Sequence, residues 1–178
     1  MRYLDIKTAD INNGEGLRVS LWVSGCEHRC PGCHNPQSWN KNNGKEFTKE
    51  TFEYLVSALT TGMKRGLTII GGEPLTDYNY PEVLQLVKRL KGMMPELNIW
   101  VYTGYYYDEL VEQDKTEIFD YIDVLVDGRY EEDLKDKTLK YFILSTGYLI
   151  SDLEFLITFF CSSQAHIKFT AVGRDVAI

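Results

Sequence analysis

Apolar and polar positions follow two different periods along most of the chain. Short runs of Val, Leu, Ile and Trp predict four strands, at residues 18–24, 67–70, 98–103 and 124–126. Apolar side chains spaced three and four positions apart predict three helices, at residues 48–62, 80–92 and 107–119, with Thr48 as the first N-cap and Gly92 as the end of the second helix. This alternation is typical of βαβ units around a mainly parallel sheet.

Each predicted strand ends in a glycine turn, and these turns contain Gly25, Gly71 with Gly72, Gly104 and Gly128. In parallel α/β folds the carboxyl ends of the strands meet at one edge of the sheet, which carries the functional site. The number of strand–helix units is too small for a closed eightfold barrel. We therefore predict an α/β fold with a mainly parallel sheet, either a partial, open β/α barrel or an open sheet.

Length and charge restrict the class of protein. The chain has 178 residues, the length of one domain. Its 26 acidic and 19 basic residues give a net charge of −7, which argues against nucleic acid as a partner because phosphate binding needs Lys and Arg. Residues 1–13 include Asp5 and Asp10 and no long apolar run, so no signal peptide is predicted and a cytoplasmic, reducing compartment is expected. Clustered cysteines in that compartment are more often metal ligands or redox groups than disulfides.

The regular alternation ends by Tyr141, which predicts a main domain at residues 1–141 and an atypical apolar tail at residues 142–178. Part of the tail, residues 142–160, is long enough to cross a membrane, but Asp152 and Glu154 make insertion unfavourable, so no membrane association is expected. We expect the tail to be irregular, to form no separate domain and to lie outside the functional site.

Three of the four cysteines lie in the segment CEHRCPGC, directly after the first predicted strand: Cys26, Cys30 and Cys33. Their spacing would align them on one face of a helix, but Pro31 and Gly32 disfavour a regular helix there. A loop that wraps three thiolates around one centre fits this composition better.

Two kinds of centre are compatible with three thiolates. Zinc takes four tetrahedral nitrogen or sulfur ligands, so His28 or His34 would complete a Cys3His site. A [4Fe–4S] cluster takes thiolates at its iron corners, and three cysteines would leave the fourth iron open for a substrate or cofactor. A chance grouping of unrelated cysteines is disfavoured, because a free cysteine is normally buried among apolar groups and this loop is polar.

The CxxxCxxC spacing, together with the sequence Gly-Gly-Glu-Pro at residues 71–74 after a later strand, resembles the radical S-adenosylmethionine superfamily. A narrower resemblance is to the glycyl-radical activases of anaerobic ribonucleoside-triphosphate reductase. It extends over about residues 3–141 and is carried by residues 13–18, 23–26, 30–35, 99–105 and 124–128. Beyond it, the chain continues with an apolar sequence that the family does not have.

The resemblance implies a fold of the radical S-adenosylmethionine type, with a [4Fe–4S] cluster and S-adenosylmethionine as cofactors. It implies reductive cleavage of S-adenosylmethionine to a 5′-deoxyadenosyl radical, which generates a glycyl radical on the large subunit of the reductase. A low-potential electron donor such as flavodoxin or ferredoxin would be a further partner. The alternatives are another small radical enzyme, either a different glycyl-radical activase or a 7-deazaguanine-pathway synthase, and a non-enzymatic zinc module.

The resemblance also implies roles for individual residues. The cluster ligands and catalytic residues would be Cys26, Cys30 and Cys33. The residues that bind S-adenosylmethionine would be Gly32, Cys33, His34, Gly71, Gly72 and Glu73. Within this set the glycine turn and Glu73 would receive the methionine ammonium group, and the residues around His34 would line the adenine side. Arg18 and Asp127 are further candidates for contact with the substrate.

Overall fold

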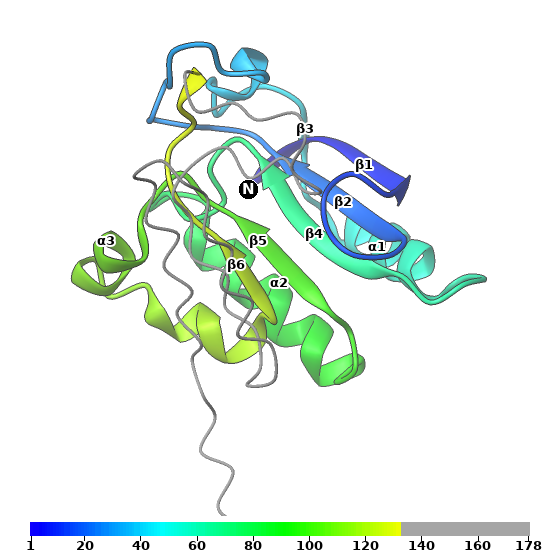
Figure 1. The fold of residues 1–178 in the computed structure, drawn as a ribbon. Coiled ribbons are helices and arrows are strands. Elements are labelled where there is room, and N and C mark those ends of the chain that lie inside the picture. Colours follow the sequence, from blue (N-terminus) through cyan, green and yellow to red (C-terminus); the bar gives the residue numbers. More distant parts are fainter. Residues whose placement is uncertain (133–178) are drawn as a thin grey trace, which may run out of the picture.

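Six strands form one open, mixed sheet in the order β3-β1-β2-β4-β5-β6 in the computed structural model, which describes residues 1–132 (Figure 1). The strands are β1 (Arg2–Asp10), β2 (Arg18–Val23), β3 (Lys45–Glu46), β4 (Gly66–Gly71), β5 (Ile99–Tyr102) and β6 (Val124–Val126). From β2 to β6 the neighbouring strands are parallel, whereas β1 pairs antiparallel with both β2 and β3. The α/β class, the four predicted strands and the mainly parallel, open sheet are confirmed; the partial barrel stays a prediction.

The sequence pattern does not predict β1 or β3. β1 alternates between half-buried and exposed positions and carries Arg2, Asp5 and Lys7, so it lacks the apolar run that marks β2. β3 is only two residues long and exposed. Both strands are held by ladder hydrogen bonds, with β1 paired to β2 from Tyr3 opposite Val23 to Asp10 opposite Arg18. An antiparallel strand with one face towards solvent needs no continuous apolar run.

The helices α1 (Lys49–Thr60) and α2 (Tyr80–Met93) cover one face of the sheet (Figure 1). Thr48 is the N-cap of α1, as predicted, because its hydroxyl accepts a hydrogen bond from the Thr51 amide at 3.4 Å. Alternate strand residues point towards these helices, as the pleat of a strand requires. The core between sheet and helices includes Val19, Leu21, Leu67, Ile69, Ile99, Val101 and Leu125 from the strands and Phe52, Leu55, Val83, Val87 and Leu90 from the helices.

Two predicted helix boundaries are wrong. The predicted third helix divides into α3 (Tyr107–Glu112) and a 3-10 helix, η2 (Thr116–Tyr121). Asp114 between them has a φ of 55°, in the left-handed region, which ends an α-helix. The second helix continues through Gly92 to Met93, since a helix tolerates glycine at a cost of about 1 kcal/mol relative to alanine.

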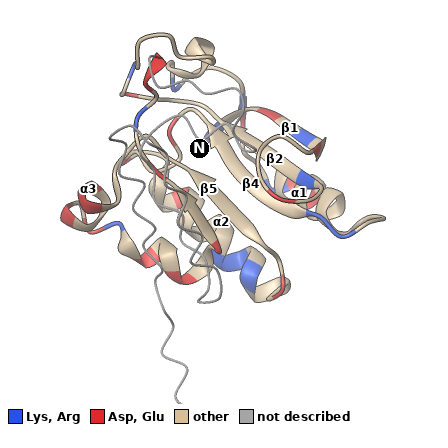
Figure 2. Ribbon diagram, viewed as in Figure 1, with Lys and Arg blue, Asp and Glu red and all other residues tan. Residues whose placement is uncertain are grey.

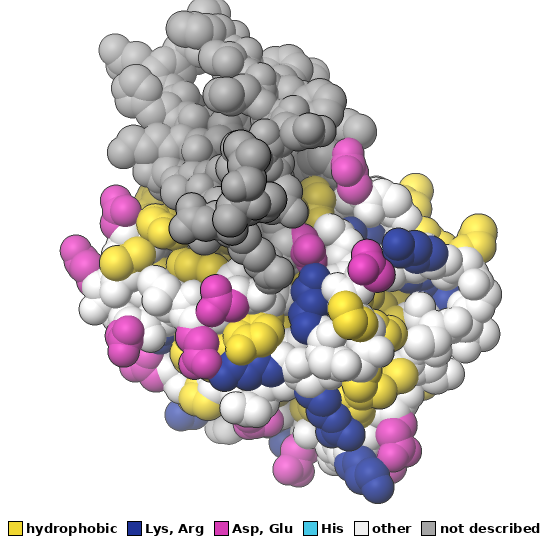
Figure 3. Space-filling model, turned by 90° about the horizontal axis from the view of Figure 1, so that it is seen from below, with side chains coloured by type: hydrophobic (Ala, Val, Ile, Leu, Met, Phe, Trp, Pro, Cys, Tyr) yellow, Lys and Arg dark blue, Asp and Glu magenta, His cyan; other side chains and the backbone are white. Residues whose placement is uncertain are grey.

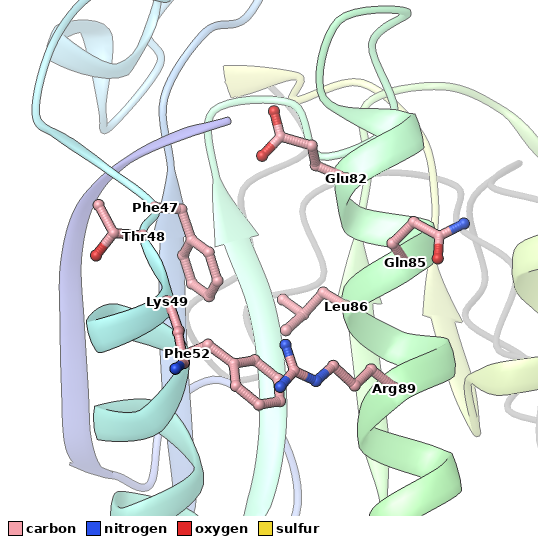
Figure 4. Close-up of a pocket in the computed structure, with 8 residues that line it drawn as sticks. All are labelled: Phe47, Thr48, Lys49, Phe52, Glu82, Gln85, Leu86 and Arg89. Carbon is pink, nitrogen blue, oxygen red and sulfur yellow. The ribbon is translucent and has the colours of Figure 1, made fainter.

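A groove lies in the helical layer of the outer surface. It has a volume of about 340 Å³, lies between α1 and α2, and is lined by Phe52 and Leu86, with the Arg89 guanidinium 3.8 Å from the centre of the Phe52 ring (Figure 4). None of the predicted site residues lines this groove. Acidic residues gather on α3, and Lys and Arg lie in the second half of α2 (Figure 2). On the face in Figure 3, hydrophobic side chains form small areas separated by charged ones.

The predicted tail lies outside the described residues, and so does Cys161. Residues 133–141 of the predicted main domain also lie outside them. Within residues 1–132, no helix is both long and apolar enough to cross a membrane.

Candidate metal centre

The carboxyl ends of the parallel strands bring the predicted glycine turns together. The amide of Gly72 donates a hydrogen bond to the Val23 carbonyl at 2.9 Å, and the amide of Glu73 donates to the Gly25 carbonyl at 2.7 Å. The turn after β4 is therefore bonded directly to the backbone that enters the cysteine loop. The prediction that these strand ends meet at one edge is confirmed.

Two glycines of this edge are required by close packing. A Cβ atom on Gly72 would lie 2.4 Å from the carbonyl oxygen of Gly25, which is far inside contact distance. Gly25 has a φ of +93°, and a Cβ atom on it would lie 2.5 Å from the Tyr78 hydroxyl. Gly71, with a φ of +116°, supplies the left-handed conformation in the turn. The close approach at Gly72 is thus to the backbone of the cysteine loop.

The cysteine loop is irregular, as predicted, and the thiols of Cys26, Cys30 and Cys33 are free and partly buried. A turn bonds the Cys33 amide to the Cys30 carbonyl at 3.2 Å, and the Asn35 amide lies 3.4 Å from Cys33 Sγ. Burial raises the pKa of the Cys26 thiol to about 11, despite backbone hydrogen bonds to its sulfur from His28 and Arg29. Metal binding requires the thiolate, so a metal bound here would displace this proton.

The histidines near the cysteine loop bear on the choice between a zinc ion and a cluster. Within the described residues, no three His, Cys, Asp or Glu side chains are placed to hold one metal ion. Both histidines proposed for a zinc site have other partners, because His28 contacts Glu73 and His34 contacts Tyr130. Thiolates that each bind a different iron corner need not converge on one point.

Buried donors next to the loop also fit a bound group. In the part of the chain that the structure describes, the Ser24 hydroxyl and the Asn35 side-chain amide are buried and accept or donate no hydrogen bond. These two residues stand just before and just after the segment that holds the three cysteines. An unpaired buried polar group is costly, so a partner that binds here would stabilise both.

Glu73 lies at the centre of the edge and is only 1% exposed. One carboxylate oxygen accepts hydrogen bonds from the Leu75 amide at 2.9 Å and the Thr103 hydroxyl at 2.7 Å. The other accepts from the Gly104 amide at 2.6 Å and lies 2.9 Å from His28 Nε2. A carboxylate has about four acceptor positions, so protein groups occupy them all. Binding of the methionine ammonium by Glu73 stays a prediction, but the side chain already has a full set of partners.

The residues predicted for the adenine side lie at the outer end of the loop. Gly32 and His34 are exposed, and Gly32 has a φ of +72°. His34 Nε2 lies 3.2 Å from the Tyr130 hydroxyl, with the two rings 5.0 Å apart. The Glu132 side chain packs against Gly32, where a Cβ atom would overlap it. The segment after β6 therefore contacts this part of the loop.

The structure separates the two further candidates for contact with substrate. Asp127 is at the carboxyl edge but buried, and it accepts a hydrogen bond from the Tyr107 amide at 2.8 Å at the start of α3. Arg18 is at the opposite edge, where it pairs with Gly66 at the start of β4. Its guanidinium is buried and donates to the carbonyls of Leu67, Asn98 and Glu15. The prediction that Arg18 belongs to the site is wrong, because its side chain supports the fold.

Sequence reasoning missed the residues that join the loops of this edge. Thr103 and Gly104 follow β5 and bind the Glu73 carboxylate. Asn79 is 1% exposed, and its side-chain amide donates to the carbonyls of Ser24 and Glu73 at 2.9 and 3.0 Å. Their positions offered a signal, since Thr103 and Gly104 end a predicted strand and Asn79 precedes a predicted helix.

Comparison with known proteins places these observations in a family. Residues 12–151 match the family described as "4Fe-4S single cluster domain". The chain is 44% identical over 141 residues to the anaerobic ribonucleoside-triphosphate reductase-activating proteins of Salmonella typhimurium and Escherichia coli K12, which covers 78% of this chain and 91% of each relative. It is 42% identical over 139 residues to the protein of that name from Enterobacteria phage T4, over 78% of this chain and 87% of the relative. The chain therefore belongs to the family of anaerobic ribonucleoside-triphosphate reductase-activating proteins.

Proposed function

We propose that this protein holds a [4Fe–4S] cluster on Cys26, Cys30 and Cys33, binds S-adenosylmethionine beside it, and activates the large subunit of an anaerobic ribonucleoside-triphosphate reductase. The observation that carries the proposal is the direct bonding of the cysteine loop to the Gly71–Gly72 turn, through the Glu73 amide and the Gly25 carbonyl. This bond keeps two segments of distant sequence next to each other. The names of the relatives support the reductase as partner.

When bound, the cluster would supply the electron for reductive cleavage of S-adenosylmethionine to methionine and a 5′-deoxyadenosyl radical, and this radical would take a hydrogen atom from a glycine of the reductase. The protein contributes binding, orientation and exclusion of water. Cys26, Cys30 and Cys33 would hold three iron corners as thiolates and would leave the fourth corner open. Gly71 and Gly72 would bind the methionine end of the cofactor, and Gly32 with His34 would bind the adenine side.

The residues around the cysteines set the electronic properties of the site. Backbone amides of His28 and Arg29 hydrogen-bond to the Cys26 sulfur. Hydrogen bonds to sulfur, together with burial, are among the main determinants of cluster reduction potential. A low-potential donor such as flavodoxin or ferredoxin is the reductant that this chemistry needs.

Anaerobic reconstitution tests the proposal. The full chain is loaded with iron and sulfide, reduced and mixed with S-adenosylmethionine and the large reductase subunit. We expect iron and sulfide in equal amounts, formation of methionine and 5′-deoxyadenosine, and an electron paramagnetic resonance signal from a glycyl radical. A large subunit with alanine at the radical-forming glycine is the matched control and should give no such signal. Cofactor cleavage without a glycyl radical on the reductase would favour a different radical enzyme, and one tightly bound zinc ion would favour the zinc module.

A further inference from the structure

His28 lies in the chain between the first two predicted cluster ligands, and its ring contacts the Glu73 carboxylate. Its side chain is 8% exposed, and its Nε2 atom lies 2.9 Å from the Glu73 carboxylate. Because a carboxylate accepts only, the ring N–H is the donor in this contact. The cysteine loop is thus tied by a side chain to the turn after β4, in addition to its backbone bond.

Two further contacts fix the plane of the His28 ring. The Tyr105 ring packs edge-on against it, with centroids 4.6 Å apart and an interplanar angle of 73°. Gly104 leaves room for it, because a Cβ atom at that position would lie 2.4 Å from His28 Cδ2. Tyr105 is in turn held by Lys115, whose Nζ lies 5.0 Å from the ring centre and donates to the Leu75 carbonyl at 2.8 Å.

The backbone of His28 reaches the Cys26 ligand. Its amide, with that of Arg29, hydrogen-bonds to the Cys26 sulfur. His28 therefore contacts two parts of the site: its backbone amide binds the sulfur of Cys26, a predicted iron ligand, and its ring binds the buried Glu73 carboxylate. In the described part of the chain, no backbone–backbone hydrogen bond involves an amide of residues 27–32, so the loop depends on such side-chain contacts for its position.

We propose that His28 is a positioning residue, clamped by Glu73, Tyr105 and Gly104, which holds Cys26 and the cysteine loop at a fixed place against the Gly71–Gly72 turn. The clamp rests on the proposed function for its purpose, because a cluster ligand loop and a cofactor-binding turn must keep a constant separation. Residues that orient metal ligands without binding the metal commonly change metal affinity or activity by about 10–100-fold when altered. Glu73 then acts through its side chain as the anchor of the clamp.

Three variants of the full chain test this clamp. His28→Leu removes the donor, His28→Gln keeps an N–H donor at a similar distance from the backbone, and Gly104→Ala leaves the histidine but fills the space of its ring. Lys91→Met is the matched control, since it breaks a partly buried pair with Asp123 at the other end of the sheet. The first measurement is hydrogen exchange of the metal-free protein, and the second is the rate at which the reconstituted protein releases iron to a chelator.

We expect His28→Leu and Gly104→Ala to exchange the hydrogen-bonded amides of the loop, at positions 25, 26, 28, 29 and 33, about tenfold faster and to release iron about tenfold faster, with His28→Gln close to the wild type. Lys91→Met should leave both rates unchanged. The proposal would be overturned if His28→Leu exchanged its loop amides and released iron at the wild-type rates. It would also be overturned if both His28→Leu and Gly104→Ala lost protection from hydrogen exchange throughout the sheet. If the wild-type chain assembled no cluster, the proposed function would fail, but the exchange measurement would still decide whether the clamp exists.

Discussion

Glu73 at the carboxyl edge of the parallel strands and Arg18 at the amino edge are both buried charged side chains, but they hold different parts of the structure. At the carboxyl edge, Glu73 is 1% exposed and accepts hydrogen bonds from three separate segments, including the cysteine loop. At the amino edge, Arg18 is also 1% exposed and donates to backbone carbonyls, with its guanidinium 5.0 Å from the centre of the Trp100 ring. Glu73 lies 2.9 Å from His28 Nε2, and Arg18 donates to the Thr68 hydroxyl as well as to carbonyls.

This comparison shows that both charged side chains are held by protein groups in this structure. Both side chains use their polar atoms on protein partners, which offsets the cost of burying a charge. The two residues differ in the chemical groups found on the segments that they bind. Glu73 binds a loop with three free thiols, whereas Arg18 binds the ends of strands and a turn without metal-ligating chemistry. The ligand chemistry of the molecule is therefore concentrated at one edge, and changes at the two edges should have separable effects.

The largest expected effect comes from the thiols. Changing Cys26, Cys30 or Cys33 to alanine should abolish cluster assembly, because alanine offers no donor atom to iron. Stability of the metal-free protein should change little, since the loop is irregular and partly exposed. Iron and sulfide analysis after reconstitution, with urea unfolding of the metal-free protein, measures both. Cys161→Ala is the matched control, and loss of iron in that variant alone would show that the ligands are assigned wrongly.

The next effect belongs to the amino edge. Arg18→Met should lower the free energy of unfolding by about 3 kcal/mol, because it leaves several buried carbonyl acceptors without donors. At a temperature where the variant is folded, iron content after reconstitution should equal that of the wild type. Urea unfolding and iron analysis separate the two results. A variant of wild-type stability that failed to hold iron would contradict the division between the edges.

A pair of glycines offers a finer comparison. Gly72→Ala would place a methyl group 2.4 Å from the Gly25 carbonyl, so we expect it to displace the cysteine loop and reduce iron content. Gly14→Ala would place a methyl group 2.7 Å from Arg18 Cδ, and Gly14 has a φ of +133°. We therefore expect the free energy of unfolding to fall by about 1–3 kcal/mol, with normal iron content. Iron analysis and urea unfolding of both variants check this. Equal effects of the two variants on iron content would argue against a local role for Gly72.

The sequence predicts those parts of the fold in which burial alone decides the structure. The parallel strands can be predicted from their apolar runs, because alternate residues such as Val19 and Leu21 lie in the core. The residues between them are largely buried as well. The position of β1 could not be predicted, because its pairing depends on backbone hydrogen bonds, which leave no apolar pattern in the sequence. The end of α3 could not be predicted either, because it depends on the left-handed conformation of a single residue, Asp114.

The candidate site shows the same limit. The cysteine spacing and the glycine turn are visible in the sequence because the chemistry requires those residue types. The side-chain contacts are not visible, since His28 and Glu73 are 45 positions apart and Thr103 is 30 positions from Glu73. Nothing in the sequence indicates that the Glu73 carboxylate is hydrogen-bonded to these loops, because its partners are known only from the fold. Arg18 was misplaced for the same reason, because its partners come from residues far along the chain.

The smallest expected effect concerns acid stability near the carboxyl edge. Partial burial raises the pKa of Glu109, but hydrogen bonds from the Arg129 guanidinium and the Tyr106 amide outweigh it, so the pKa lies below its usual 4.5. The unfolded chain then takes up this proton at a higher pH than the folded protein. The stabilisation is therefore complete above about pH 4.5 and is lost as the pH falls through the lowered folded pKa. Glu109→Gln should reduce the free energy of unfolding by about 0.5 kcal/mol at neutral pH, as expected for a partly exposed pair, and by less in acid. Urea unfolding of wild type and variant across this pH range measures the difference in their free energies of unfolding. A difference that grew as the pH was lowered would contradict the prediction.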